Sequence, residues 1–469
     1  MYEIHELSFH PSSLSRFFPA ILRFIMNAWW TEYLPDIIRK RLEDRRQLQK
    51  IIGNTGWQFA DILFRMGAGF IVSIWVTRYL GPERYGLLNY AIAFVALFSP
   101  IASLGLEDIV VRNIARDPLC KDITLGSAFF LKLAGGAVSF ISAVAVIVLL
   151  RRNDPQMQWL TGIIAGGAIL QTATVIECWF NSQVQSRYRV IARNIAFAIS
   201  SLLKIFLISL DAPLIAFAWV GIIEVGIYSL GLVATYRWAG NFIGNWHITL
   251  AKAGSLFKDS WPLALSIIAM TVYQRIDQIM LGEMVGNKAV GVYSVAVRLS
   301  EVWGFIPTAL YWSVYPAIVK AKSKSDEAFY SQLQKFYNLM ALWSYTVALP
   351  ITLIGPWLVT KVYGKAFSGA GSVLIVLIWA TLFSNLELAR SAFLATMNWS
   401  KAYLVTVTLG AVLNIALNFV LIPRYDVLGA AVASFVSYWF AVHGACFLFR
   451  PLRRTGGMIT KAMLYPKIW

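Results

Sequence analysis

The chain has 469 residues, of which 58% are hydrophobic and 14% are charged, and its formal net charge at neutral pH is +17. Soluble domains carry about 25% charged residues, so the composition excludes an ordinary soluble protein and predicts one embedded in a bilayer. In so apolar a chain, the basic excess is interpreted as lysine and arginine on the cytoplasmic face, and no nucleic-acid partner is expected. Three scattered cysteines, Cys120, Cys178 and Cys446, predict no disulfide framework.

Residues 1–50 precede the first long apolar stretch and show no signal-peptide pattern. Phe17–Trp30 is aromatic and apolar, whereas Arg39–Arg46 is strongly charged. An interfacial amphipathic helix on anionic lipid fits this pattern. A poorly ordered extension fits it too, and so does a start of translation at Met26.

About twelve apolar stretches then follow one another between Ile52 and Leu448, each close to the ~20 residues that cross a bilayer core as a helix. Because backbone groups inside lipid must be satisfied within their own segment, helices are expected throughout. We predict an all-α integral membrane protein with about 12 transmembrane helices. The predicted spans are 54–77, 86–106, 125–150, 159–181, 191–210, 213–236, 259–282, 289–315, 335–356, 370–396, 402–422 and 428–449.

Lysine and arginine are unevenly distributed between alternate loops. The richer loops include Arg112–Lys121, Arg237–Lys258 and Lys320–Lys324, and the poorer ones include Arg78–Arg84 and Lys361–Lys365. Both termini lie on the richer side and are themselves basic. The positive-inside rule therefore predicts that both termini are cytoplasmic.

A short glycine pattern occurs twice. Gly81 and Gly86 follow the first predicted span, and Gly286 and Gly291 follow the seventh, at the same spacing and with an offset of 205 residues. Glycines at these positions let the chain turn sharply between two antiparallel helices.

The next predicted helix of each half carries a proline, Pro100 or Pro307, which removes a backbone hydrogen bond and kinks the helix. Both are candidate hinges, although static kinks that shape a cavity explain them as well. The repeat predicts two pseudo-symmetric six-helix bundles of parallel topology, with a substrate path between them. The predicted boundaries are 1–50 for the extension, 51–240 and 255–450 for the bundles, 241–254 for a cytoplasmic linker and 451–469 for a cytoplasmic tail.

Several ionisable side chains lie inside the predicted spans, where each costs a few kcal/mol to bury. They are expected to face a wet cavity or one another. Four cations, Arg65, Lys132, Arg275 and Arg298, are the candidate ligands for an anionic substrate such as a diphosphate. The candidate ion-coupling or paired acids are Asp61, Glu177, Glu224, Asp277, Glu301 and Glu387.

Three pairs of opposite charges lie one helical turn apart, namely Asp61/Arg65, Arg298/Glu301 and Glu387/Arg390. Such pairs can also be local neutralising pairs that only permit insertion. Lys132 and Lys204 have no such partner within four residues, so they are expected to face the cavity, although Lys204 can also snorkel.

The sequence has no phosphate-binding loop, because Gly86 is followed by Leu87 where that motif requires lysine. The four histidines have no metal-ligand spacing, and no loop is long enough for a catalytic domain. We therefore expect no cofactor, no metal and no enzymatic activity. Any driving force must come from an ion gradient, the membrane potential or substrate chemistry elsewhere.

Several segments resemble the Wzx-type polysaccharide flippases of the multidrug/oligosaccharidyl-lipid/polysaccharide exporter superfamily. They are Arg78–Gly86, Ser103–Leu106, Arg112–Arg116, Tyr363–Phe367, Leu413–Tyr425 and Gly429–Ala431. The resemblance covers about residues 51–450. The chain departs from that family in its N-terminal extension and in Asp426, where the family often has glycine.

The resemblance implies two six-helix bundles that move an undecaprenyl-diphosphate-linked oligosaccharide across the bacterial inner membrane during O-antigen or exopolysaccharide synthesis. It implies a role for arginines in the first helix of each half, which Arg65 and Arg275 match. Partners would be the lipid-linked substrate, the bilayer, and polysaccharide polymerase and export proteins.

Other functions remain open from the sequence. A peptidoglycan-precursor flippase and an ion-coupled drug exporter share the superfamily, with Asp61 as a candidate proton site in the latter. A membrane glycosyltransferase, polymerase or ligase would also serve polysaccharide synthesis. Such enzymes usually carry acidic or histidine residues in a large outer loop, which this chain lacks.

Overall fold

The computed structural model describes residues 46–467, in which every regular element is a helix. The described residues from Asp61 onward form one compact unit. Most of the predicted N-terminal extension, residues 1–45, lies outside the described part of the chain, and the predicted interfacial helix falls there.

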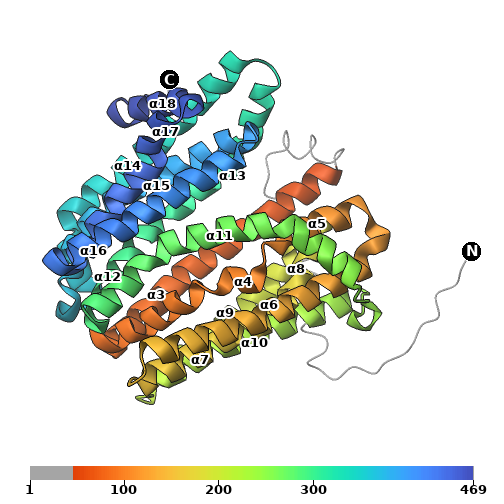
Figure 1. The fold of residues 1–469 in the computed structure, drawn as a ribbon, viewed down its shortest axis with the longest axis horizontal. Helices are drawn as coiled ribbons and strands as arrows, with labels where there is room; N and C mark the ends of the chain where they lie inside the picture. Colours follow the sequence, from red (N-terminus) through yellow and green to blue (C-terminus); the bar gives the residue numbers. More distant parts are fainter. Residues whose placement is uncertain (1–45, 468–469) are drawn as a thin grey trace, which may run out of the picture. The chain divides into compact units, whose positions relative to one another are not determined.

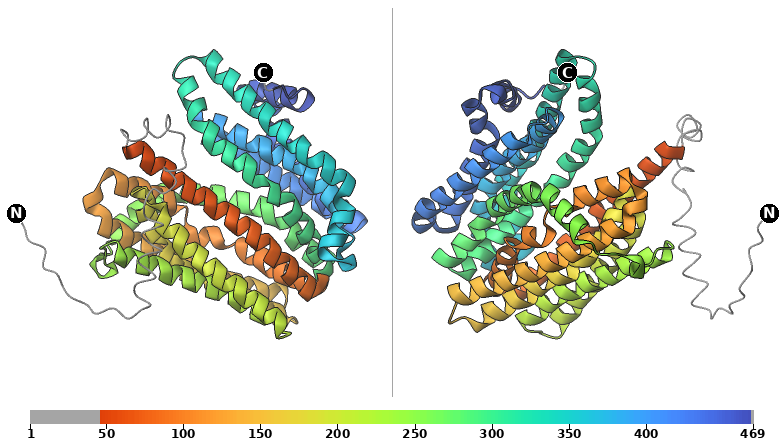
Figure 2. Two further views of the ribbon diagram at one scale, coloured as in Figure 1. Left: turned by 180° about the vertical axis from the view of Figure 1, so that it is seen from behind. Right: turned by 45° about the vertical axis from the view of Figure 1, so that its right-hand side comes forward.

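The helices fall into two groups that follow the two halves of the sequence. The first group is α3 (Arg46–Ala96), α4 (Ser99–Ser103), α5 (Leu106–Arg116), α6 (Lys121–Leu150), α7 (Pro155–Leu170), α8 (Val175–Ser182), α9 (Ser186–Ser209) and α10 (Leu214–Trp238). The second group is α11 (Leu250–Met284), α12 (Asn287–Glu301), α13 (Phe305–Lys322), α14 (Asp326–Tyr363), α15 (Ala370–Thr396), α16 (Ser400–Trp439), α17 (Ala445–Leu448) and α18 (Arg453–Leu464). In Figures 1 and 2 the cyan and blue helices of the second half gather on one side and the orange and yellow helices on the other. Helix α11 contacts helices of both groups.

Eight helices of the described residues are long and apolar enough to cross a membrane, and a bent pair makes up to nine. Two of the long helices also contain a sharp turn, because Gly81 in α3 (φ 68°, ψ 173°) and Asp426 in α16 (φ 55°, ψ −133°) have non-helical backbone angles. The 35 residues of α11 are long enough to cross but more charged. With these turns and α11 included, the chain has the predicted 12-helix fold in two pseudo-symmetric six-helix bundles.

The two prolines occupy equivalent breaks. Helix α3 and the run from α4 to α5 are bent by 42° at a break before Pro100, and the 3-10 turn Val302–Gly304 precedes Pro307 in α13. Each proline therefore lies in the first turn of a new helix, where its missing N–H costs no intrahelical bond. The breaks are present as predicted, and their use as hinges stays a prediction.

The buried core is shared at one end of the bundles and divided at the other. A single cluster joins Val76 and Tyr85 of the first half to Tyr293, Val359 and Phe367 of the second. This cluster lies at the end where the chain turns at Gly81, Gly286 and Gly364, which the charge distribution predicts to be extracytoplasmic. At the opposite end the buried residues form two separate clusters, and Leu256 of α11 belongs to the cluster of the first half. There the halves are joined through the start of α11, which contacts α4, α5 and α6, and Arg112 lies 2.8 Å from Asp259.

The repeated glycines have two different structural roles. Gly81 and Gly286 have positive φ values of 68° and 120°, as the predicted turns require. Gly86 and Gly291 instead pack the two halves against each other. A Cβ on Gly86 would lie 1.7 Å from the Asn287 carbonyl oxygen, and one on Gly291 would lie 2.1 Å from that of Pro82. For this second pair the predicted turn role is therefore wrong, because close helix contact is what excludes a side chain.

The C-terminal segment expected as a tail contains a packed helix. Helix α18 lies against α14 and α17. The Tyr345 hydroxyl donates to the Met463 carbonyl oxygen at 2.7 Å, and the Gln334 amide donates to that of Met458 at 3.1 Å. This helix extends the core at the predicted cytoplasmic end of the second bundle.

Candidate functional site

A polar cavity of about 590 Å³ lies between the two halves. Its volume is within the range of about 300–1,000 Å³ that is usual for small-molecule sites. Its polar lining comes from α3, α9, α10, α11 and α12. The polar and charged lining residues are Arg65, Tyr85, Asn89, Lys204, Glu224, Arg275, Gln278, Ser294, Arg298 and Glu301.

The cavity collects cations that are far apart in the sequence. Arg65, Arg275 and Arg298, three of the four predicted ligands, all line it, and Lys204 is a fourth cation. Two carboxylates, Glu224 and Glu301, also line it, so four cations face two acids. This excess of positive charge suits an anionic ligand.

The local fold explains why Arg275 and Arg298 meet. They lie 11 residues before and 12 residues after Gly286, where α11 ends and the antiparallel α12 begins. At about 1.5 Å per residue, both side chains start at nearly the same depth from that turn.

The four cations of the cavity differ in whether another protein group already forms a hydrogen bond or ion pair with them. Within residues 46–467, neither Arg275 nor Arg298 forms a hydrogen bond or ion pair. Arg65 lies 3.2 Å from Asp61, and Lys204 lies 3.4 Å from Glu224. Two guanidinium groups are therefore available to a ligand with their full set of donors.

Lys132 does not reach this cavity. Its buried ammonium group donates to the Thr174 hydroxyl at 2.8 Å and lies 3.6 Å from a carboxylate oxygen of Glu107. The expectation that Lys132 faces the cavity is thus corrected, because Glu107 precedes it by 25 positions and helical spacing could not reveal the pair. Lys204 likewise finds Glu224 on a neighbouring helix.

Most of the candidate acids are neutralised by a cation. The pairs are Asp61–Arg65 (3.2 Å), Glu177–Arg193 (3.1 Å), Glu177–Arg189 (3.5 Å), Glu224–Lys204 (3.4 Å) and Glu387–Arg390 (2.9 Å). The predicted Arg298/Glu301 pair differs, because both residues line the cavity without an ion pair between them in the described part of the chain.

Asp277 is held only by neutral groups. Its carboxylate accepts hydrogen bonds from the Asn418 amide at 2.6 Å and the Tyr293 hydroxyl at 2.8 Å, and Ser434 donates as well. It is buried, and no cation pairs with it among the described residues. A second cavity, of about 260 Å³ inside the second half, reaches this carboxylate.

A cluster at the predicted extracytoplasmic end joins the halves through polar contacts. Arg151 lies 3.0 Å from Glu283 and donates to the Gly282 carbonyl oxygen at 2.9 Å. The Tyr90 hydroxyl also donates to Glu283, and Arg78 donates to the Lys361 carbonyl oxygen at 2.7 Å. These residues carry no local sequence signal, because their partners are more than a hundred positions away.

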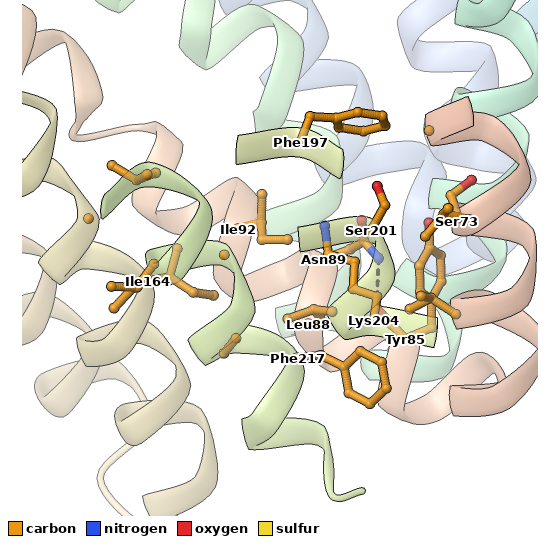
Figure 3. A pocket seen from close by; sticks show the side chains of 18 of the residues that line it. Ser73, Tyr85, Leu88, Asn89, Ile92, Ile164, Phe197, Ser201, Lys204 and Phe217 are labelled. Atoms are coloured by element: carbon orange, nitrogen blue, oxygen red, sulfur yellow. Dashed lines mark hydrogen bonds between the residues drawn. The ribbon is translucent and has the colours of Figure 1, made fainter. Parts of the chain in front are cut away.

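An apolar pocket of about 330 Å³ adjoins the polar cavity within the first half. It is bounded by α3, α7, α9 and α10. In Figure 3, Asn89, Ser201 and Lys204 lie between Phe197 and Phe217. The pocket shares Lys204 and Arg298 with the cavity.

In residues 46–467, no group of three or more histidine, cysteine, aspartate or glutamate residues could hold a metal ion. The cavity itself presents guanidinium, ammonium and amide groups, from Arg65, Arg275, Arg298, Lys204, Asn89 and Gln278, that can recognise a ligand.

Residues 51–318 match the family described as Polysaccharide biosynthesis protein, and residues 262–420 match the MatE family. The chain is 22% identical over 400 residues to the probable flippase AglR of Haloferax volcanii, which covers 83% of this chain and 81% of that protein. It is 23% identical over 403 residues to a putative O-antigen transporter of Shigella flexneri, covering 82% and 94%.

Solved structures share the fold at low identity. A multidrug resistance MATE family transporter of the MOP superfamily, in an inward-facing conformation, aligns with a TM-score of 0.68 and 16% identity, over 87% of this chain and 96% of that one. A MOP superfamily transporter from Pyrococcus furiosus aligns with a TM-score of 0.61 and 16% identity, over 88% and 96%. Because the first family match spans more than half of the chain, the protein belongs to the polysaccharide biosynthesis protein family.

Proposed function

We propose that this protein is a flippase that moves a lipid-linked oligosaccharide, carried on undecaprenyl diphosphate, across the bacterial inner membrane. The observation that carries the proposal is the cavity between the halves, where Arg275 and Arg298 form no hydrogen bond or ion pair with any described residue and Arg65 and Lys204 add positive charge. The names of the relatives, a probable flippase and a putative O-antigen transporter, support the same function.

The cavity suits a diphosphate for a chemical reason. An arginine fork donates two parallel hydrogen bonds to phosphate oxygens, and lysine adds a point charge. Cavity polar groups such as Gln278 and Asn89 are suited to sugar hydroxyls. A charge-assisted contact of this kind contributes about 1.5–3 kcal/mol, so two or three of them can select a doubly phosphorylated headgroup over neutral lipids.

The packing supports an assignment of the conformational state. The shared core closes the end that the charge distribution predicts to be extracytoplasmic, and at the other end the buried clusters of the halves are separate apart from the contact of α11 with the first half. The described state is accordingly assigned as open to the cytoplasm, with both termini on that side and the bundles bounded near 51–240 and 255–450. In alternating access the predicted extracytoplasmic end would then open while the cytoplasmic end closes.

The function is tested by substituting cavity arginines. Arg275→Ala and Arg65→Ala should each reduce the initial rate of lipid-linked oligosaccharide export about 10- to 100-fold, because each loses a charge-assisted contact. The matched control is Arg152→Ala, which removes one positive charge from a loop outside the cavity. Export that stays normal in both variants at normal protein levels would contradict the assignment.

Two alternatives share the fold. The first is a drug exporter, which is disfavoured because the cavity that would bind organic cations is itself lined by four cations and two acids. The proton site expected for such an exporter, Asp61, is also paired with Arg65. A peptidoglycan-precursor flippase would use the same diphosphate chemistry, so transport of the two lipid-linked substrates must be compared directly. An assay for sugar transfer by the purified protein separates both from a glycosyltransferase, and no transfer is expected.

A further inference from the structure

The apolar pocket beside the cavity is built from four helices of the first half. Its lining includes Val72 and Leu88 from α3, Ile164 from α7, and Phe217 and Ile222 from α10. Figure 3 shows Leu88, Ile164 and Phe217 around the same space. A recess of about 330 Å³ with these walls is suited to a hydrocarbon group.

The pocket and the polar cavity form one continuous recess. Asn89, Phe197, Lys204 and Arg298 line both. The walls therefore change from charged to apolar across Lys204 and Arg298. A ligand with an anionic group joined directly to a hydrocarbon chain matches this order.

Two glycines line the pocket at positions where a side chain would have room. Gly167 of α7 and Gly221 of α10 line it, and a Cβ on either would meet no atom within 4 Å. Neither has a positive φ. A glycine inside a helix is destabilising by roughly 0.5–1 kcal/mol relative to alanine. Alanine at either position would therefore stabilise the helix without a clash.

Other helical glycines of the first half show the contrast. A Cβ on Gly231 would lie 2.9 Å from that of Ala192, and one on Gly136 would lie 3.0 Å from the Ala168 carbonyl oxygen. Those glycines permit close helix packing, whereas Gly167 and Gly221 leave a volume empty.

We propose that this pocket binds the first isoprene units of the polyprenyl chain, with the attached diphosphate held between Lys204 and Arg298. The inference rests on the proposed flippase function and adds a subsite to it. Transfer of a chain from lipid into an apolar pocket brings little hydrophobic gain, because lipid tails are equally apolar. The pocket instead keeps the part of the chain nearest the charges out of water and fixes its direction, which orients the headgroup.

The test compares two soluble probes, inorganic diphosphate and farnesyl diphosphate, by titration calorimetry on the purified full-length protein in one detergent. Farnesyl diphosphate should bind about tenfold more tightly or better, because the pocket buries apolar carbons. Gly167→Leu and Gly221→Leu should remove that advantage and leave the affinity for inorganic diphosphate within about twofold. Affinities are referred to the free probe in water outside the micelles, because partition into detergent lowers the free concentration of farnesyl diphosphate but not that of inorganic diphosphate.

The matched control is Gly162→Leu, one helical turn and a half before Gly167 on α7, where a Cβ also meets no atom within 4 Å but the residue does not line the pocket. It should keep the advantage of farnesyl diphosphate. If Gly167→Leu does not fold, Gly221→Leu carries the test, since Gly221 is exposed.

The outcomes separate the two proposals. Equal affinity of the two probes for the unmodified protein, or an advantage that survives both pocket substitutions, overturns the polyprenyl subsite and leaves the flippase proposal standing. Failure of inorganic diphosphate and farnesyl diphosphate alike to bind the unmodified protein removes the anion site itself, and with it the basis of the proposed function.

Discussion

Asp277 is the clearest case of a residue whose chemistry depends on its surroundings. A carboxylate buried at membrane depth is costly unless a cation or a proton neutralises it. Its hydrogen-bond partners Tyr293, Asn418 and Ser434 are all neutral, and the Asn418 side-chain oxygen has no partner of its own. We therefore propose Asp277, of the six candidate acids, as the site where a proton or a monovalent cation couples to transport.

Asp277→Asn should abolish the acceleration of export by an imposed sodium or proton gradient, because the amide can neither bind a proton nor attract a cation. Export into proteoliposomes, measured with each gradient in turn, reports the effect. Asp117→Asn, in an exposed loop, is the control and should keep the acceleration. A gradient dependence that is unchanged in Asp277→Asn would show that coupling lies elsewhere.

Asp426 shows the opposite situation, in which the backbone conformation determines which residue types fit the position. It has φ 55° and ψ −133° at the sharp turn within α16, a conformation that glycine adopts more readily than any L-residue. Glycine is also the residue that the resemblance to the polysaccharide flippases leads one to expect at this position. The departure noted in the sequence is therefore a strained backbone position, and it does not change the fold.

At the scale of helices, the breaks at Pro100 and Pro307 are the elements best placed to bend. Each joins two helical segments at an equivalent point of the repeat, and each proline follows its break directly. A proline cannot donate the backbone hydrogen bond that would carry a helix straight across its break, so the break persists as a point of bending. The breaks lie in the second helix of each half, which packs at the shared core through Gly86 and Gly291.

The double variant Pro100→Ala/Pro307→Ala should slow export several-fold, about 3- to 10-fold, because an extra hydrogen bond of roughly 0.5–1.5 kcal/mol stiffens each break. Binding of inorganic diphosphate and thermal stability in detergent should change little. Pro213→Ala, at the start of α10 and away from both breaks, provides the control. Export at the normal rate in the double variant would mean that the prolines are static kinks.

At the scale of the whole transporter, the contact between the halves at one end defines the state. The buried cluster there is continuous across both halves, and the Arg151–Glu283 and Arg78–Lys361 contacts add polar links. Alternating access requires these contacts to break during each cycle while the opposite end closes.

A cleavable crosslink between Arg78→Cys and Lys361→Cys, in a background without the three native cysteines, should therefore stop export. The crosslink holds the predicted extracytoplasmic end closed, because Arg78 donates directly to the Lys361 backbone. Cleavage by a reductant should restore transport, and Arg78→Cys alone should never lose it. Continued export by the fully crosslinked protein would contradict the rocking of the two halves.

Much of the fold was predictable because it rests on local and periodic features. The membrane spans follow from the length of the apolar stretches, and the two bundles follow from a repeat of glycines and prolines that any reader of the sequence can find. The candidate cations were also visible, because a charge inside an apolar stretch is conspicuous. Of the four cations that were predicted to bind the substrate, three line the cavity, namely Arg65, Arg275 and Arg298.

What the sequence by itself determined is thus the class of protein, its helices, its internal symmetry and the kinds of charge inside the membrane, since hydropathy and helical period act over a few tens of residues. Only the tertiary structure decided how those charges are used. Lys132 pairs with Glu107, Asp277 finds only neutral donors, and Gly167 lines an empty pocket. The physical reason is that pairing, burial and cavities arise from helices that are distant in the chain, whose relative rotation and depth leave no trace in local sequence patterns.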